Sequence, residues 1–305
     1  MVMTVRGNLH VTKWSITAVI ATYFGLALAT VAAAPKAELW QRWMGHDPAA
    51  TTTIDHQAWD HFVRAYVSSF ADGVNRVTYA DVTAADRKLL ENYINTLTTI
   101  LISAYNRNEQ RAYWINLYNA LTVKVVLDYY PVKSIRQIKP NVFSIGPWRK
   151  KRITVEGVEL SLDDVEHRIL RPIWRDPRLH YALNCASIGC PNLLEQAFTA
   201  ANSETLLTRA ARGYVNNARG AEVRSNRLVV SSIYKWYRED FGNTDAGVID
   251  HLQRYAEPKL SAQLRRITRI AAYRYDWALN DAAQISNRQL RARGSLFGFA
   301  SVSSR

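Results

Sequence analysis

The chain has 305 residues, a net charge of +13 and only two cysteines. Its 48% hydrophobic and 11% aromatic residues exclude a disordered or collagen-like chain. Two cysteines are too few for a four-cysteine zinc or iron–sulfur module. We therefore expect a globular protein of one large domain or two small ones.

The first 34 residues have the features of a targeting segment. Arg6 and Lys13 form a basic start, and no charged residue occurs between Trp14 and Ala34. Small residues at 31–34 provide a cleavage site of the A-x-A type. The pattern predicts a cleaved signal peptide, with an uncleaved N-terminal anchor as the alternative, because about 20 uncharged residues could span a bilayer. Both interpretations predict an exported protein, periplasmic or secreted.

Export decides which partners the positive charge could serve. Nucleic acid is not expected as a partner outside the inner membrane, although a basic chain could bind it elsewhere. Envelope anions and peptide or glycan substrates are the partners that this compartment offers. Membrane contact is expected only through an uncleaved N-terminal segment. Local pairing of arginines with carboxylates is the alternative explanation of the charge.

Three helices are predicted in the first half of the chain. Apolar residues from Trp59 to Phe70 share one helical face, and that helix is predicted to begin near Asp55. Thr83 and Asp86 predict the capped start of a second helix. The third is predicted from about Glu109 to Tyr130, before a proline. It is apolar on most sides, which is typical of a buried central helix.

The second half changes to short strands and short helices. A Glu156-Gly157 turn predicts a hairpin within residues 151–160. Ser161 and Asp164 predict the start of a short helix that ends at Pro172. The further predicted elements are a buried strand at 179–183, a helix starting at Ser203, a hairpin around Asn226-Arg227, helices at 232–241 and 245–255, and a strand at 267–275.

This order predicts one α+β domain over residues 55–280. Its helical first half is expected to pack on a small mixed or antiparallel sheet. We expect residues 35–54 to form a linker and residues 281–305 a mobile tail. By fold-level analogy, a papain- or transglutaminase-like layout also fits helices followed by strands.

Polar side chains able to do chemistry are concentrated between residues 166 and 190. This stretch contains Glu166, His167, Arg171, Arg178, His180, Asn184, Cys185 and Cys190. Upstream, Arg111, Asn116 and Asn119 place polar groups on the buried third helix. A buried asparagine needs hydrogen-bond partners, so we expect a polar network in the core. The candidate binding residues are Arg111, Asn116, Asn119, Arg171 and Arg178.

The two cysteines have three interpretations. They could form a Cys185–Cys190 disulfide in an oxidising compartment. Cys185 could instead be a nucleophile, with His167 or His180 as its base. Asn184, Asn116 or Glu166 could then orient that base. A zinc or copper site made of His167, His180, Cys185 and Cys190 is the third, although the spacing fits no standard module. Outside this third case we expect no cofactor.

The spacing of the histidines favours one base over the other. His180 and Cys185 are five residues apart, so on a straight strand their side chains would point to opposite faces. His167, on the preceding helix, is the better candidate on this argument.

Five segments resemble the domain of unknown function 547 family. They are residues 111–122 (RAYWINLYNALT), 161–171 (SLDDVEHRILR), 176–192 (DPRLHYALNCASIGCPN), 233–237 (IYKWY) and 275–280 (YDWALN). The resemblance implies the family's fold, often exported in bacteria, and no agreed activity. It also marks the stretch from 166 to 190 as the family's own, and so supports a site at Glu166, His167, His180, Asn184, Cys185 and Cys190.

Together these observations lead to two main hypotheses of function, with the His/Cys metal site as a third option. The first is an exported, thiol-dependent hydrolase or acyl transferase that uses Cys185. The second is a non-catalytic envelope-binding module with a structural Cys185–Cys190 disulfide.

Overall fold

The computed structural model describes Met1 and residues 35–140 and 144–284. The described residues from 35 onward belong to the second of the chain's two units, which begins at Ala34. Apart from Met1, the predicted signal peptide or anchor lies outside the described residues, as do all but four residues of the predicted tail. Within the described residues, no helix is long and apolar enough to cross a membrane.

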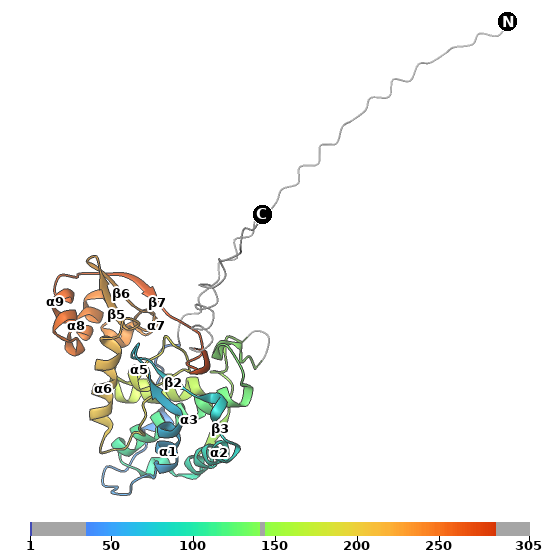
Figure 1. Cartoon of the computed structure of the whole chain (residues 1–305). Helices are drawn as coiled ribbons and strands as arrows, with labels where there is room; N and C mark the ends of the chain where they lie inside the picture. The colour runs from blue at the N-terminus through green and yellow to red at the C-terminus, as the bar shows by residue number, and fades with distance from the viewer. Residues whose placement is uncertain (2–34, 141–143, 285–305) are drawn as a thin grey trace, which may run out of the picture. The chain divides into compact units, whose positions relative to one another are not determined.

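The first half of the second unit is built from helices around α3 (Figure 1). Buried aromatic side chains such as Trp114 and Tyr118 make α3 the centre of this half. Its helices and strands are α1 (Gln57–Tyr66), β1 (Val67–Ser69), β2 (Asn75–Val77), α2 (Ala84–Thr99) and α3 (Arg107–Tyr129). Short turns of 3-10 helix lie at Gln41–Met44, Tyr79–Asp81, Ile102–Ala104 and Ile135–Gln137.

Local capping signals set these boundaries. The Thr83 side chain accepts a hydrogen bond from the Asp86 N–H at 3.0 Å, so the predicted start of the second helix is confirmed. Asn106 caps α3 in the same way, and α3 ends two residues before Pro131, close to the predicted bounds. The first helix is shorter than predicted, because the chain enters strand β1 at Val67.

The predicted hairpin is confirmed as β3 (Ile153–Val155) paired with β4 (Val158–Leu160). Glu156 and Gly157 both have positive φ, at 46° and 75°, which suits the right-handed twist of a two-residue hairpin.

Two predictions after this hairpin are wrong. Pro172 does not end the helix, because it lies in the first turn of α4 (Arg171–Trp174), where its missing N–H is not needed. The helix enters α4 directly from a π-helical turn, η5 (Asp164–Leu170). The predicted strand at 179–183 is a helical turn, α5 (Leu179–Ala182). A short apolar run fits either structure, and here the Asp176 carboxylate accepts from the Arg178 N–H at 2.9 Å and starts a turn.

The last part of the chain forms a second lobe. Its elements are α6 (Ser203–Val215), β5 (Ala221–Arg224), β6 (Arg227–Ser231), α7 (Ile233–Trp236), the 3-10 turn η6 (Arg238–Phe241), α8 (Asp245–Tyr255), α9 (Pro258–Leu264) and β7 (Ile270–Arg274). The sheet order is β5-β6-β7, with an antiparallel hairpin and then a parallel pair. The parallel pairing requires a crossover, and helices α7 to α9 supply it.

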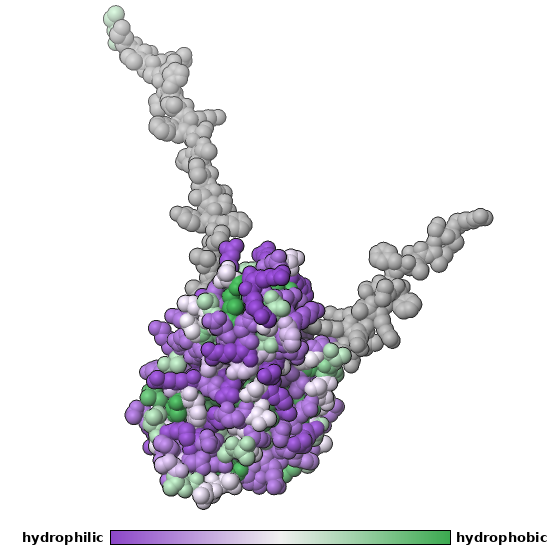
Figure 2. Space-filling view, turned by 90° about the vertical axis from the view of Figure 1, so that its left-hand side faces the viewer, coloured by the Kyte–Doolittle hydropathy of each residue, from purple (hydrophilic) through white to green (hydrophobic). Residues whose placement is uncertain are grey.

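Two hydrophobic clusters stabilise the fold. The larger surrounds α3, and the smaller lies under β5–β7 and is rich in tyrosine, including Tyr181, Tyr214 and Tyr234. The α+β class is therefore confirmed. The side that carries α6, α8 and α9 is mostly hydrophilic, with apolar residues only in small separate groups (Figure 2).

Candidate functional site

Both cysteines lie in a loop that directly follows α5, which we call the thiol loop (residues 184–192). Asn119 of α3 fixes its beginning: the amide donates to the Ala182 carbonyl at 2.9 Å and accepts from the Asn184 N–H at 2.9 Å. The Asn184 amide donates to the Pro191 carbonyl at 2.7 Å and so closes the loop. Asn119 and Asn184 therefore act as scaffolding, and neither orients a histidine.

The two thiols are free and face each other. Cys185 Sγ lies 3.0 Å from Cys190 Sγ, 3.0 Å from the Tyr275 hydroxyl and 3.3 Å from the Ser187 hydroxyl. Cys190 Sγ also accepts the Cys185 backbone N–H at 3.0 Å. Cys190 is buried, whereas Cys185 is partly exposed.

This arrangement separates the acidities of the two thiols. A hydrogen bond from Cys190 lowers the pKa of Cys185, with further contributions from Ser187 and Tyr275, and together they outweigh the opposing effect of burial. Burial raises the pKa of Cys190 well above its ordinary value, and the neighbouring Cys185 raises it further. When one thiol of the pair ionises, it is therefore Cys185, the more accessible one.

The backbone next to Cys185 is strained. Ala186 has a φ of 57°, in the left-handed region that residues with a Cβ rarely adopt. The Asn184 side chain holds this conformation by accepting from the Ala186 N–H at 2.8 Å. Strain of this kind is often found at functional sites, where the surroundings enforce it.

Aromatic rings line the approach to Tyr275. The Tyr275 ring lies 4.6 Å from Trp277 and 4.8 Å from Trp236, and Trp148 contacts Trp277 at 5.8 Å between centroids. All four rings are half-buried. These rings shield the Tyr275 hydroxyl, which bonds Cys185 Sγ, from water.

The histidines belong to a second group of residues, the histidine–carboxylate cluster (Glu166, His167, Arg171, His180 and Asp240). His180 Nε2 lies 2.6 Å from the Asp240 carboxylate, and Tyr237 stacks on its ring at 4.3 Å. Glu166 accepts a hydrogen bond from the Tyr118 hydroxyl at 2.9 Å.

Arg171 links this cluster to other segments. Its buried guanidinium donates to Asp240 at 2.6 Å, to Glu239 at 2.9 Å and to His167 Nδ1 at 3.2 Å. It also donates to the Pro35 carbonyl at 2.8 Å, at the start of the predicted linker. Backbone bonds continue this docking, because the N–H groups of residues 38 and 40 donate to carbonyls of η5.

Burial and charge fix the protonation states of the cluster. Burial lowers the pKa of His167 to about 4, so its imidazole is neutral at pH 7. Burial would raise the pKa of Asp240, but hydrogen bonds from His180 and Arg171 bring it down to about 2. Burial likewise opposes ionisation of Glu166, but its neighbours His167, His180 and Arg171 and the hydrogen bond from Tyr118 outweigh burial, so its pKa is lowered.

The two groups are adjacent in sequence but make separate contacts. Among the described residues, no hydrogen bond joins Cys185 to His167 or His180; its partners are Cys190, Ser187 and Tyr275. The parity argument against His180 does not apply, because the segment between it and Cys185 is not a strand. The described part of the chain also contains no group of three or more His, Cys, Asp or Glu side chains that could hold a metal ion.

The remaining candidate binding residues have partners within the protein. Asn116 bonds both the N–H and the carbonyl of Phe198. Arg111 pairs with Glu204 at 2.7 Å, and Arg178 pairs with Asp176 at 2.7 Å and with Glu204 at 2.8 Å. They connect α3 and α5 to α6, and this scaffolding positions the thiol loop.

Two residues that contact these groups were not singled out as site residues from the sequence. Tyr275 lies 90 residues beyond Cys185, and Asp240 lies 60 beyond His180. The only signal for Tyr275 is its place in one of the segments used for the family resemblance. Asp240 carries none, because its role depends on contacts that the fold creates.

Comparison with known proteins gives one match. Residues 102–215 match the family described as "Protein of unknown function, DUF547". The matched range contains the thiol loop and most of the histidine–carboxylate cluster, whereas Tyr275 and Asp240 lie beyond it. No curated protein and no solved structure matched the chain, so the papain- or transglutaminase-like layout stays a prediction.

Proposed function

Residues 102–215 match the DUF547 family, and on this premise we propose that the domain performs thiol–disulfide exchange. Cys185 is the attacking thiol and Cys190 the resolving thiol. The observation that carries the proposal is the pairing of the sulfurs at 3.0 Å with opposite pKa shifts. An accessible thiol of lowered pKa beside a buried thiol of raised pKa is the arrangement that such exchange requires.

The proposed exchange has two steps, formation of a mixed disulfide and its resolution. The Cys185 thiolate attacks one sulfur of a substrate disulfide; that S–S bond breaks, a substrate thiolate leaves, and a mixed disulfide forms. Cys190 then loses its proton and attacks Cys185 Sγ, and the second substrate thiolate leaves as the Cys185–Cys190 bond forms. The substrate disulfide is reduced by two electrons and the domain is oxidised by two.

The surroundings of Cys185 support each step. Ser187 and Tyr275 donate hydrogen bonds that favour the thiolate before attack. Cys190 needs little movement to reach Cys185, because Asn119 and Asn184 already hold the loop in a closed form. The disulfide expected from the sequence is, on this proposal, the oxidised state of the pair.

A second candidate is the hydrolase or acyl transferase expected from the sequence. His180 supports it, because Asp240 fixes Nε2 and leaves Nδ1 facing Glu166 at 4.0 Å, as in a base held by a carboxylate. Cys185 would then attack an acyl carbon, and His180 would have to come within hydrogen-bond reach of its sulfur.

Export to the periplasm or the exterior is also a proposal, and it rests on the first 34 residues. In that compartment the substrates would be disulfides of envelope or secreted peptides, and the positive charge would serve envelope anions or glycans. An uncleaved N-terminal segment would add a membrane anchor.

Trapping the intermediate tests the proposal. The purified reduced protein, Cys190→Ser and Cys185→Ser are each mixed with a disulfide-bonded model peptide and analysed by intact mass. We expect wild type to release two peptide thiols and gain an internal bridge. Cys190→Ser should hold the peptide as a stable mixed disulfide, and Cys185→Ser should do neither.

Three results would overturn the proposal. Equal trapping by both variants would show that Cys185 has no special role. Cys185-dependent cleavage of a p-nitrophenyl ester without any mixed disulfide would favour the hydrolase. A Cys185–Cys190 bridge that resists excess dithiothreitol in the folded protein would favour the structural disulfide of a binding module.

A further inference from the structure

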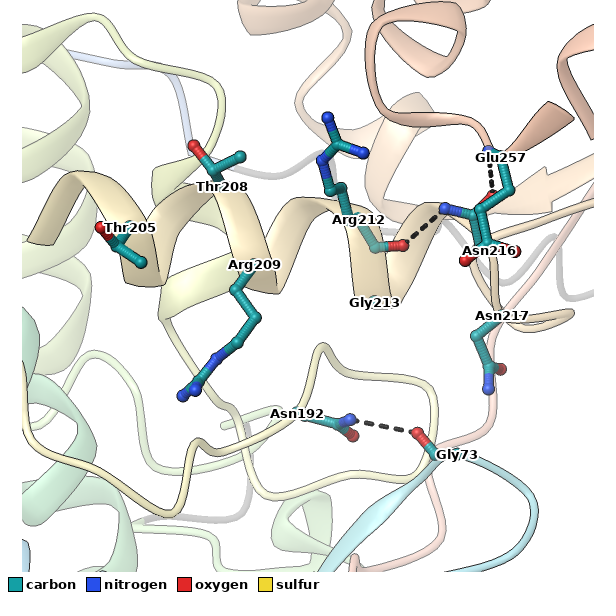
Figure 3. Close-up of a pocket in the computed structure, with 10 residues that line it drawn as sticks. All are labelled: Gly73, Asn192, Thr205, Thr208, Arg209, Arg212, Gly213, Asn216, Asn217 and Glu257. Atoms are coloured by element: carbon teal, nitrogen blue, oxygen red, sulfur yellow. Dashed lines mark hydrogen bonds between the residues drawn. The ribbon is translucent and has the colours of Figure 1, made fainter.

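A groove of about 640 Å³ runs along α6, and its lining contains neither cysteine and no member of the histidine–carboxylate cluster. Loops at Gly73 and Asn192 form its opposite wall (Figure 3). Every residue that lines it is either polar or glycine, and Gly213 leaves open space where a side chain would stand.

Two arginines of α6 give the groove its charge. Arg209 and Arg212 are exposed, and neither has a carboxylate partner among the described residues. The arginines nearby differ, since Arg111 and Arg178 are both paired with Glu204. Glu257 is the one acidic residue among the groove's lining, so the lining contains two positive charges and one negative charge.

Arg209 and Arg212 are three residues apart on α6 and therefore share a face of the helix. Their side chains diverge: Arg209 extends toward Asn192 and Gly73, and Arg212 extends away from them (Figure 3). The Asn192 amide is committed to the protein, because it donates to the Gly73 carbonyl at 3.0 Å and accepts from the Asn75 N–H at 2.8 Å. The Arg209 and Arg212 guanidinium groups are therefore the charged hydrogen-bond donors available to a ligand, and Asn192 and Gly73 form a fixed wall of the groove.

Size and lining together define the ligand class. From Thr205 to Asn216 the groove's lining covers eleven helical steps, or about 16 Å, and its volume lies in the range of small-molecule sites. A single inorganic anion would leave most of this length empty. A peptide would find neither an apolar pocket nor an exposed strand edge in the lining. Hydroxyl-bearing rings that carry carboxylates match amides, hydroxyls and planar guanidinium groups.

We infer that this groove binds a short acidic oligosaccharide, whose carboxylates pair with Arg209 and Arg212. The site goes beyond the thiol chemistry proposed above, because it contains neither cysteine. It nevertheless borders the thiol loop: the Arg219 side chain bonds Asn192 and also donates to the Ile188 carbonyl at 2.9 Å.

Titration calorimetry with tri-galacturonate on the full chain tests the inference. We expect wild type to bind and the Arg209→Ala/Arg212→Ala protein to bind about tenfold or more weakly, because the variant removes both guanidinium groups that pair with the carboxylates. Arg265→Ala/Arg266→Ala is the matched control, since it removes the same charge from exposed residues outside the groove's lining. Its affinity should equal that of wild type, as should that of Cys185→Ser.

Comparison ligands decide the class. A neutral galactose trisaccharide, tri-glutamate and inorganic phosphate should each bind at least tenfold more weakly than tri-galacturonate. Equal binding of tri-glutamate would overturn the inference in favour of an acidic peptide, and equal binding of phosphate in favour of a simple anion site. Equal loss of affinity in the control variant would show that net charge alone attracts the ligand. Binding of tri-galacturonate without thiol–disulfide exchange would contradict the proposed function and support this inference. Exchange without binding would contradict this inference and support the proposed function.

Discussion

The thiol loop and most of the histidine–carboxylate cluster come from the same stretch of sequence, yet their surroundings have opposite effects on reactivity. Around Cys185, neutral donors lower the pKa of a partly exposed thiol and leave it able to react. Around His180, charges neutralise one another in the interior and hold η5, α5 and η6 together. One stretch of sequence rich in reactive residue types therefore forms two structures with different roles. The thiol loop is reactive, and the histidine–carboxylate cluster is a scaffold.

The largest expected effect concerns the cluster's role as scaffold. Arg171→Met should lower the free energy of unfolding by about 3 kcal/mol or more, because it leaves the Asp240 and Glu239 carboxylates without their buried partner. Urea denaturation measures this. Arg87→Met, which breaks an exposed pair with Asp128, should cost less than about 1 kcal/mol. Similar losses in both variants would contradict the scaffolding role.

Acid should destabilise the protein through its buried histidines. Burial lowers the pKa of His56, His167 and His251 to about 4, so between pH 6.5 and 4 the unfolded chain binds more protons than the folded one. Stability is then lost as the pH falls, by about 2 kcal/mol for each histidine at pH 5. Asp163 opposes this, because burial raises its pKa to about 7 and its protonation stabilises the fold as the pH falls.

Denaturant curves at pH 7 and pH 5 check the sign of this effect. His251→Gln should make the loss between these pH values smaller than in wild type, and His46→Gln, an exposed histidine, should leave it unchanged. A stability that rises between pH 7 and pH 5 would contradict the neutral state assigned to the buried histidines.

The reactivity of the thiol loop should depend on its neutral donors. Tyr275→Phe removes a 3.0 Å hydrogen bond to Cys185 Sγ, so the apparent pKa of that thiol should rise. Its alkylation by iodoacetamide at pH 7 should slow by roughly two- to tenfold. The control is Tyr273→Phe, whose hydroxyl bonds Arg238 instead. An unchanged rate in Tyr275→Phe would remove Tyr275 from the site.

The smallest effect concerns the strained residue of the loop. Ala186→Gly should raise the free energy of unfolding by about 0.5 kcal/mol, because glycine adopts a φ of 57° without a Cβ clash. Thermal unfolding checks it. Ala211→Gly, in the middle of α6, should instead lower stability by about 1 kcal/mol. Destabilisation of both variants would mean that no strain is stored beside Cys185.

The sequence predicted well what depends on neighbours along the chain. The Thr83 cap, the limits of α3 and the Glu156-Gly157 turn follow from local hydrogen bonds and backbone preferences, and all three are confirmed. The strand predicted at 179–183 is wrong because a short, mostly apolar run of five residues fits a strand and a helical turn alike.

The site was only half predictable for a related reason. Cys185, Cys190, His167 and His180 stand out by residue type within 25 positions of sequence. Their actual partners come from the second lobe: Asp240 contacts His180 from 60 residues away, and Tyr275 contacts Cys185 from 90 residues away. Spacing along the chain carries no information on such contacts, so it could suggest a histidine partner for Cys185 but could not identify the tyrosine that bonds it.

The most direct test of this account is the pH dependence of Cys185 alkylation by iodoacetamide in wild type and in His180→Gln, with folding checked by circular dichroism. If the thiol loop works independently of the histidine–carboxylate cluster, both proteins will show the same apparent pKa, below that of an ordinary thiol. If the apparent pKa of Cys185 in folded His180→Gln rises to the ordinary value, a thiolate–imidazole pair exists, and the separation of the two groups is wrong.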